Sequence, residues 1–268
     1  MMIQDGASDI WIYEWARDTL TRLTSDPAQD STPVWTPDSR RIVFASDRSE
    51  KSTPNLYWQS ADGTDDVQRL TRSKNRQGPG SWHPSGRFLA FEENLKLMIL
   101  PIVGNDALGW KPGTPYSFSN SPLKGTEPMF SPDGRWLAYM SDESGRIEVY
   151  VRPFPGAGGK WQISTGGGQN PTWSPTRHEL FYGVNGQIMV AAFTADRDTF
   201  RAEKPRLWSE ARYQTRGTGS RMFDVHPDGE RFALAPATQT PIGAKLDKVV
   251  FIFNFFDELR RIAPATKR

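Results

Sequence analysis

Five copies of one short pattern recur along the 268-residue chain, and this repeat limits the fold more than any other feature. Each copy has an aromatic or apolar residue, a hydroxyl residue or histidine, a proline, two turn residues and then an alternating apolar run. The copies are centred on Pro37, Pro84, Pro132, Pro175 and Pro227, which are 47, 48, 43 and 52 residues apart. Repeats of this length are typical of the four-stranded blades of a β-propeller.

The clearest copy is the segment Phe130–Tyr139, with the sequence FSPDGRWLAY. Pro132 fixes its own φ, Asp133 can bond to the backbone ahead of it, and Gly134 accepts a positive φ. The apolar residues that follow alternate as they do in a half-buried strand. We therefore predict a tight hairpin here, with Gly134 in the left-handed conformation.

The repeat predicts an all-β fold, in which residues 1–268 form a single β-propeller domain of four-stranded antiparallel blades. The strand count favours the six-bladed type with an incomplete first blade. Asp9–Glu14 and Leu20–Thr24 predict a third and a fourth strand without the first two strands. Lys248–Phe253 predicts another third strand, one without a fourth. The residues Phe255–Ile262 are a candidate for a short terminal helix.

An incomplete ring leaves strand edges bare, and bare edges pair with other chains. The apolar run Val249–Phe253 favours association of such an edge with another strand. Three outcomes follow: an open ring, a five-bladed closure in which residues 9–24 lie against residues 222–235, or edge pairing in a homodimer. We favour a six-bladed arrangement whose gap is covered by the C-terminal segment or by a second copy of the chain.

The repeat resembles that of TolB-like, WD-repeat-like β-propellers. More narrowly, the chain is similar to the propeller that follows the kinase domain in some bacterial serine/threonine protein kinases. The stretches that carry this resemblance are Phe130–Tyr139 (FSPDGRWLAY), Ser141–Gly145 (SDESG), Glu148–Gly156 (EVYVRPFPG), Lys160–Gly168 (KWQISTGGG) and Val249–Leu259 (VVFIFNFFDEL). The resemblance implies a protein-interaction or sensor domain within a larger bacterial signalling protein, in an extracytoplasmic (periplasmic) location. The kinase motifs themselves are absent from the sequence.

Composition and motifs exclude several kinds of chemistry. The net charge of +2 is too balanced for a dedicated nucleic-acid or membrane-surface binder, and no apolar run is long enough to insert into a membrane. The chain has no cysteine and no Gly-x-Ser-x-Gly nucleophile motif. His178-Glu179 lacks the second histidine of a zinc helix. His83 and His226 share one column of the repeat, so their role is best interpreted as structural.

Two polar columns are candidates for a binding site. One column ends each second strand and includes Asp47 and Asp142; the other precedes or opens the first strands and includes Thr32, Glu127 and Asn170. In an up-and-down blade both columns lie on the face that carries the blade-connecting loops. The predicted ligand-binding residues at this tunnel mouth are Thr32, Asp47, Glu127, Asp142, Gln169, Asn170 and Arg221. The alternative interpretation is that the Asp and Asn side chains cap turns by bonding backbone amides.

The sequence thus favours a binding or sensor propeller without catalytic residues, which recognises a protein, peptide or glycan on its loop-rich face. No cofactor is expected. The alternative is a hydrolase or lyase that holds a divalent cation such as calcium in the central tunnel, with oxygen ligands from Asp47, Glu127, Asp142 and Asn170.

Overall fold

The computed structural model describes residues 2–4, 7–14, 16–105, 109–118, 125–156, 158–196, 199–213, 221 and 223–234. Every regular element in this part of the chain is a β-strand. No helix in these residues is long and apolar enough to cross a membrane. The predicted strand Lys248–Phe253 and the candidate helix Phe255–Ile262 lie outside the described residues.

Four antiparallel sheets form the body of the molecule, and each follows the strand order expected for a blade. The first contains β5 (Asp30–Trp35), β6 (Arg41–Ser46), β7 (Asn55–Ser60) and β8 (Gln68–Arg69). The second contains β9 (Gln77–Trp82), β10 (Phe88–Glu93), β11 (Lys96–Asn105), β12 (Gly109–Pro112) and β13 (Tyr116–Ser117). The third contains β14 (Gly125–Phe130), β15 (Trp136–Ser141), β16 (Glu148–Pro153) and β17 (Trp161–Gln162). The fourth contains β18 (Gln169–Trp173), β19 (Glu179–Val184), β20 (Gln187–Asp196), β21 (Thr199–Ala202) and β22 (Arg206–Ser209).

Three two-stranded hairpins accompany the four sheets. They are β1 (Met2–Gln4) with β2 (Ala7–Asp9), β3 (Trp11–Glu14) with β4 (Thr19–Arg22), and β23 (Phe223–Val225) with β24 (Phe232–Leu234). The hairpin β3–β4 confirms the third and fourth strands predicted near the N-terminus. The hairpins β3–β4 and β23–β24 form separate sheets, and the number of blades stays a prediction.

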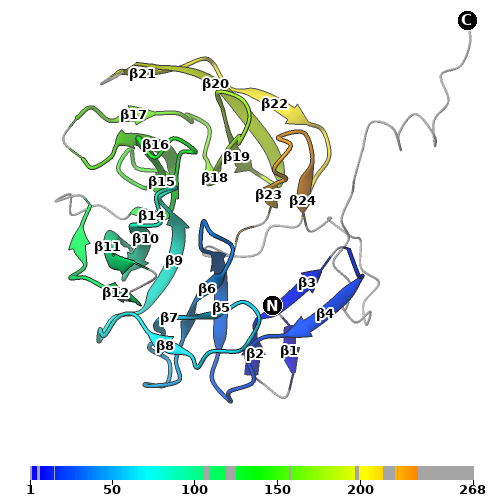
Figure 1. Ribbon diagram of the computed structural model, residues 1–268. Coiled ribbons are helices and arrows are strands. Elements are labelled where there is room, and N and C mark those ends of the chain that lie inside the picture. Colours follow the sequence, from blue (N-terminus) through cyan, green and yellow to red (C-terminus); the bar gives the residue numbers. More distant parts are fainter. Residues whose placement is uncertain are drawn as a thin grey trace, which may run out of the picture.

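The sheets are arranged around a common centre, with their first strands on the inside (Figure 1). Neighbouring blades meet through these inner strands: β5 contacts β9, β9 contacts β14, β14 contacts β18, and β18 contacts β23. The predicted all-β propeller of four-stranded antiparallel blades is therefore confirmed. In a propeller the inner strands surround a central tunnel, and different sets of turns form its two mouths.

Four strands, β1, β2, β12 and β21, were not predicted from the sequence. β1 is three residues long and too short to show an alternating pattern. β11 and β20 run for ten residues each, and their far halves pair with the extra strands β12 and β21 beyond the blade. These extensions have no counterpart in the other sheets, so the repeat carries no signal for them.

Small residues let the blades approach face to face, as the alternating pattern predicts. Ala90 of β10 is fully buried in one cluster with Phe130 and Leu137 of the next blade. Ala138 of β15 is fully buried with Trp173 and Leu180 of the blade after that. A larger side chain at either alanine would push adjacent sheets apart, because protein interiors are close-packed.

The repeated turn has the structure that its residues predict. In the third blade, Gly134 has a φ of +74° and Ser131 Oγ accepts a hydrogen bond from Trp136 N at 3.0 Å. Asp133 Oδ1 accepts from Ser131 Oγ at 2.5 Å and from Arg135 N at 3.1 Å. The same column is structural in the blades with histidine, because His83 Nδ1 accepts from Ser85 N and His226 Nδ1 accepts from Asp228 N.

The turn carboxylates should make stability depend on pH. Partial burial raises the pKa values of Asp38 and Asp133, but hydrogen bonds from Thr36 and Ser131 and from backbone amides outweigh it and lower both pKa values. Hydrogen bonding, first from Glu230 N, also lowers the pKa of Asp228. Because the folded pKa values lie below the unfolded ones, these groups stabilise the fold above the ordinary aspartate pKa and lose that effect as the pH falls through the folded values.

We therefore expect the urea midpoint to drop as the pH falls below about 4. A variant with Asp38→Asn, Asp133→Asn and Asp228→Asn together should be less stable at neutral pH and should show a weaker acid dependence. Parallel urea titrations at several pH values measure this. Equal pH slopes for the variant and the wild type would show that the turns do not carry the effect.

One inner tryptophan differs from its counterparts. Trp82, Phe130 and Trp173 occupy the same repeat column and are 8%, 5% and 5% exposed, whereas Trp35 is 48% exposed. Trp173 is covered because its indole Nε1 donates to Met129 O on the preceding blade at 2.9 Å. Trp35 lies at the end of β5, the inner strand of the first of the four sheets.

Candidate functional site

A strained backbone column marks the loop-bearing mouth of the tunnel. Thr32, Glu127 and Asn170 have φ values of +50°, +54° and +53°. Each lies at a β-bulge, where the register shifts within the first strand, and each precedes a proline. Residues other than glycine rarely adopt a positive φ, and such strain persists only where the surrounding structure holds it in place. The sequence predicted these three residues to be equivalent, and the structure places them in equivalent backbone positions.

Glu127 joins two blades at this mouth. Its Oε2 accepts hydrogen bonds from Asn170 N at 2.7 Å and from Asn170 Nδ2 at 2.8 Å. Glu127 lies on β14 and Asn170 on β18, so the carboxylate holds the third and fourth blades together. Burial raises the pKa of nearby Glu92, and the Glu127 carboxylate raises it further. The mouth is thus an acidic, partly desolvated environment.

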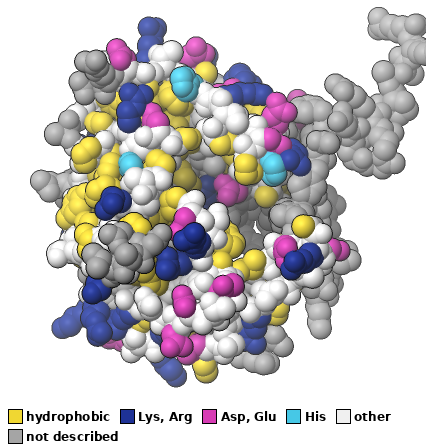
Figure 2. Space-filling view, in the orientation of Figure 1, with side chains coloured by type: hydrophobic (Ala, Val, Ile, Leu, Met, Phe, Trp, Pro, Cys, Tyr) yellow, Lys and Arg dark blue, Asp and Glu magenta, His cyan; other side chains and the backbone are white. Residues whose placement is uncertain are grey.

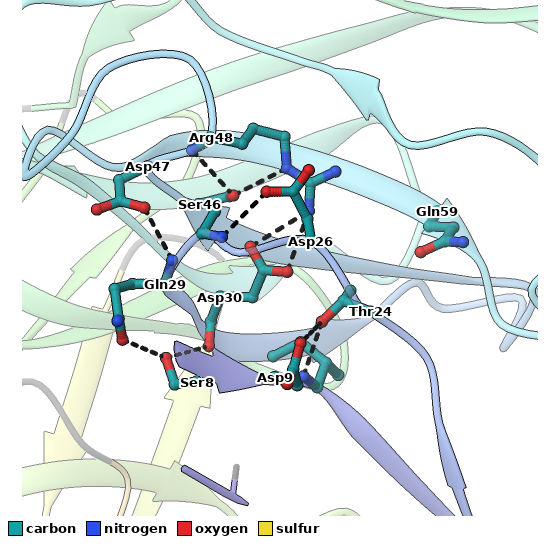
Figure 3. A network of polar contacts seen from close by, with 12 residues as sticks. Ser8, Asp9, Thr24, Asp26, Gln29, Asp30, Ser46, Asp47, Arg48 and Gln59 are labelled. Atoms are coloured by element: carbon teal, nitrogen blue, oxygen red, sulfur yellow. Dashed lines mark hydrogen bonds and ion pairs between the residues drawn. The ribbon is translucent and has the colours of Figure 1, made fainter. Parts of the chain in front are cut away.

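The other predicted residues have different surroundings. Asp47 accepts from Gln29 N at 2.8 Å and from Ser52 N at 3.1 Å, which is the turn-capping role that the alternative interpretation assigns (Figure 3). Asp142 lies in the turn after β15, where its carbonyl accepts from Gly145 N. Gln169 opens β18 and is half-buried. These residues lie at the ends of strands on the loop-bearing face, with roles in turns and strand pairing.

Arg221 makes contacts that the sequence did not indicate. Its Nη2 donates to Thr172 Oγ1 at 2.9 Å, and its Nη1 lies 3.9 Å from the Met129 sulfur. It also lies 3.5 Å from Asp224 Oδ1. Met129, Thr172 and Asp224 line a groove on the opposite face, so the Arg221 guanidinium lies beside that groove.

A repeated tether, which the sequence analysis missed, fixes the blade-connecting loops. Buried Glu148, at the start of β16, accepts from Arg146 Nε at 2.9 Å, from Ser164 Oγ and from Gly167 N at 3.0 Å. Asn55, at the start of β7, accepts from Arg69 Nη2 at 2.7 Å and from Ser73 N at 2.9 Å. In these two blades a side chain at the head of the third strand therefore holds the loop that leads to the next blade.

The same tether recurs at the N-terminus. Asp9 Oδ2 accepts from Arg22 Nη2 at 2.7 Å, and Thr24 Oγ1 accepts from Ile10 N at 3.0 Å. Figure 3 shows Asp9 and Thr24 beside the buried pair of Asp30 and Arg48. The signal for this motif is the recurrence of Leu or Ile followed by Thr or Ser at residues 23–24, 70–71 and 163–164.

The described residues contain no group of three or more His, Cys, Asp or Glu that could hold a metal ion. Of the four oxygen ligands expected for calcium, Glu127 and Asn170 are bonded to each other, and Asp47 bonds loop amides. The described arrangement therefore presents hydrogen-bonding groups at the mouth and brings together no set of carboxylates.

Comparison with known proteins agrees with this geometry. A TolB beta propeller domain model matches residues 1–105. The resemblance to TolB-like propellers, first seen in the repeat, is thus confirmed for that part of the chain. The peptidase YuxL of Bacillus subtilis, which is itself uncharacterised, is 24% identical to this chain over 54% of the chain's length. This chain covers only 27% of YuxL.

Two solved structures show the same fold at low sequence identity. Hydrazine synthase from Kuenenia stuttgartiensis is 14% identical with a TM-score of 0.59, and the match covers 84% of this chain and 38% of that one. A candidate 6-phosphogluconolactonase from Bacteroides uniformis is 15% identical with a TM-score of 0.51, covering 84% of this chain and 69% of that one. At such identities the likeness establishes the propeller fold alone.

Proposed function

We propose that this TolB-like chain is a recognition propeller that binds a protein or peptide partner at its loop-bearing tunnel mouth. The observation that carries the proposal is the column of positive φ values at Thr32, Glu127 and Asn170. Backbone strain of this kind costs about 1–3 kcal/mol per residue and clusters at binding and catalytic sites. Loops held on rigid strands suit recognition.

The electrostatics of this mouth support a polar partner surface. Glu127 and Glu92 bring negative charge to the mouth, and the bonded amide of Asn170 places further polar atoms beside it. A peptide can donate main-chain or side-chain N–H groups to such oxygens. A glycan is the second ligand class that these groups suit, since its hydroxyls can donate in the same way.

Binding should depend on the charge of Glu127. We would select peptides from a phage-displayed random library on the wild-type protein and measure each synthesised peptide by calorimetry. Glu127→Gln retains an oxygen for Asn170 but removes the charge, and we expect affinity to fall about tenfold or more, because hydrogen bonds to charged groups contribute about 1.5–3 kcal/mol. Asp133→Asn, on the opposite face, is the matched control.

Two results would contradict the proposal. Loss of binding in Asp133→Asn with normal binding in Glu127→Gln would move the site to the opposite face. A sub-micromolar calcium site abolished by Glu127→Ala, together with esterase or lactonase activity, would favour the hydrolase alternative. The similarity to YuxL keeps an enzyme-associated role as the second candidate, in which the propeller admits peptides to a peptidase domain.

A further inference from the structure

A groove of about 310 Å³ opens at the opposite mouth of the tunnel, on the face made by the turns between first and second strands. Four turn prolines from neighbouring blades line it: Pro84, Pro132, Pro175 and Pro227. All four are exposed. Figure 2 shows this face, where hydrophobic side chains (yellow) gather around a hollow near the middle.

The groove is apolar at its walls and polar at its floor. Met129, Thr172 and Asp224 come from the inner strands of three blades and also line the groove; we call this part of the lining its floor. The Arg221 guanidinium contacts all three, at 3.9 Å from the Met129 sulfur, 2.9 Å from Thr172 Oγ1 and 3.5 Å from Asp224 Oδ1. Arg221 therefore places a positive charge beside these three lining residues.

This floor offers a donor and an acceptor side by side. A guanidinium carries five N–H donors, and within the part of the chain that the structure describes Arg221 donates to one oxygen, from Nη2 to Thr172 Oγ1. The Asp224 side chain is 71% exposed, and its ion pair with Arg221 is long at 3.5 Å. Exposed pairs of this kind contribute little stability, so both groups can bond to a ligand without a large cost.

We propose that the groove binds an extended, uncharged apolar peptide segment, rich in proline or leucine. Its main-chain carbonyl accepts from Arg221, a neighbouring amide donates to Asp224, and its side chains cover the exposed turn prolines. A free carboxylate suits the floor less well because Asp224 repels it, and an amine suits it less well because Arg221 repels it. The adjacent opposite charges thus match a neutral peptide bond better than either ion.

This site is separate from the loop-bearing mouth, and its test is independent of the function proposed above. The probe is a short leucine–proline peptide with an acetylated N-terminus and an amidated C-terminus, titrated by calorimetry and followed by tryptophan fluorescence. Arg221→Met retains most of the aliphatic stem and removes the donors, and Asp224→Ala removes the acceptor. We expect each change to weaken binding about three- to tenfold, the usual effect of one lost hydrogen bond.

Two control variants make the result specific. Arg177→Ala, on the same face but outside the groove, should bind the blocked peptide as the wild type does, and so should Glu14→Ala, on the exposed part of β3. Thermal melting establishes that each variant is folded, and Asp224→Ala tests the site even if Arg221→Met proves unstable. Unchanged affinity in both groove variants would overturn the proposal. So would tighter binding of the same peptide with a free carboxylate, or no binding at millimolar peptide.

Discussion

Asp30→Ala should cost about 3–5 kcal/mol of the free energy of unfolding, the largest single effect expected in this chain. The Asp30 side chain is fully buried, and its Oδ2 lies 3.0 Å from Arg48 Nη2, whose side chain is only 15% exposed. Arg48 also donates from Nε to Ser46 Oγ and lies over the rings of Phe44 and Tyr57. Removing the carboxylate leaves the guanidinium buried in these surroundings without a counter-charge.

Urea unfolding of purified protein measures this effect. The matched control is Glu14→Ala, which removes an exposed ion pair with Arg17 whose side chains are 48% and 76% exposed; that change should cost less than about 1 kcal/mol. The double variant Asp30→Leu with Arg48→Leu should lose less than Asp30→Ala alone, because it buries no unpaired charge. If Asp30→Ala and Glu14→Ala prove equally mild, the buried pair is not an important source of stability.

Gly134→Val should destabilise the third blade by at least about 1–3 kcal/mol, the cost of placing a branched residue at positive φ. A second effect adds to this strain. A Cβ atom at Gly134 would overlap the imidazole Nε2 of His83 on the preceding blade. His83 packs edge-on against Phe130, with centroids 5.2 Å apart, so the clash would disturb an aromatic cluster between two blades.

Gly86→Val separates the two causes. Gly86 has a similar φ of +70°, but a Cβ atom there meets no heavy atom within 4 Å. It should therefore show the backbone strain alone, and the difference in melting temperature between the two variants reports the contact with His83. In a His83→Ala background the extra cost at Gly134 should shrink. An unchanged melting temperature for Gly134→Val would rule out the turn assignment.

The structure of the blade could be predicted from the sequence because interactions between neighbouring residues determine it. The turn at Pro132, Asp133 and Gly134 is specified by neighbours in the chain, and its strands alternate on a fixed period, so one repeat predicts the next. The contacts by which buried side chains hold the blade-connecting loops could not be predicted in this way. Glu148 and Gly167 are 19 residues apart, and whether they meet depends on the register between the third and fourth strands and on the path of the loop.

The candidate site shows the same limit. The sequence placed Thr32, Glu127 and Asn170 in one column, because column membership follows from the repeat. The sequence could not predict the contact that the Arg221 side chain makes with Thr172 of β18, 49 residues away in the chain. The sequence also placed Trp35 and Trp82 in one column of the repeat. Trp35 is 48% exposed and Trp82 is 8% exposed, and the repeat does not indicate which neighbouring residues cover each blade.

The tethers make the path of a blade-connecting loop independent of the side chains that the loop carries. Glu148 is 1% exposed and Asn55 is 1% exposed, yet these two side chains hold the loops of their own blades by bonding main-chain amides. Main-chain bonds do not depend on which side chains the loop carries. The outward residues of a loop can therefore change while its path is preserved, and a propeller of this kind can acquire a new specificity one loop at a time without redesign of its core.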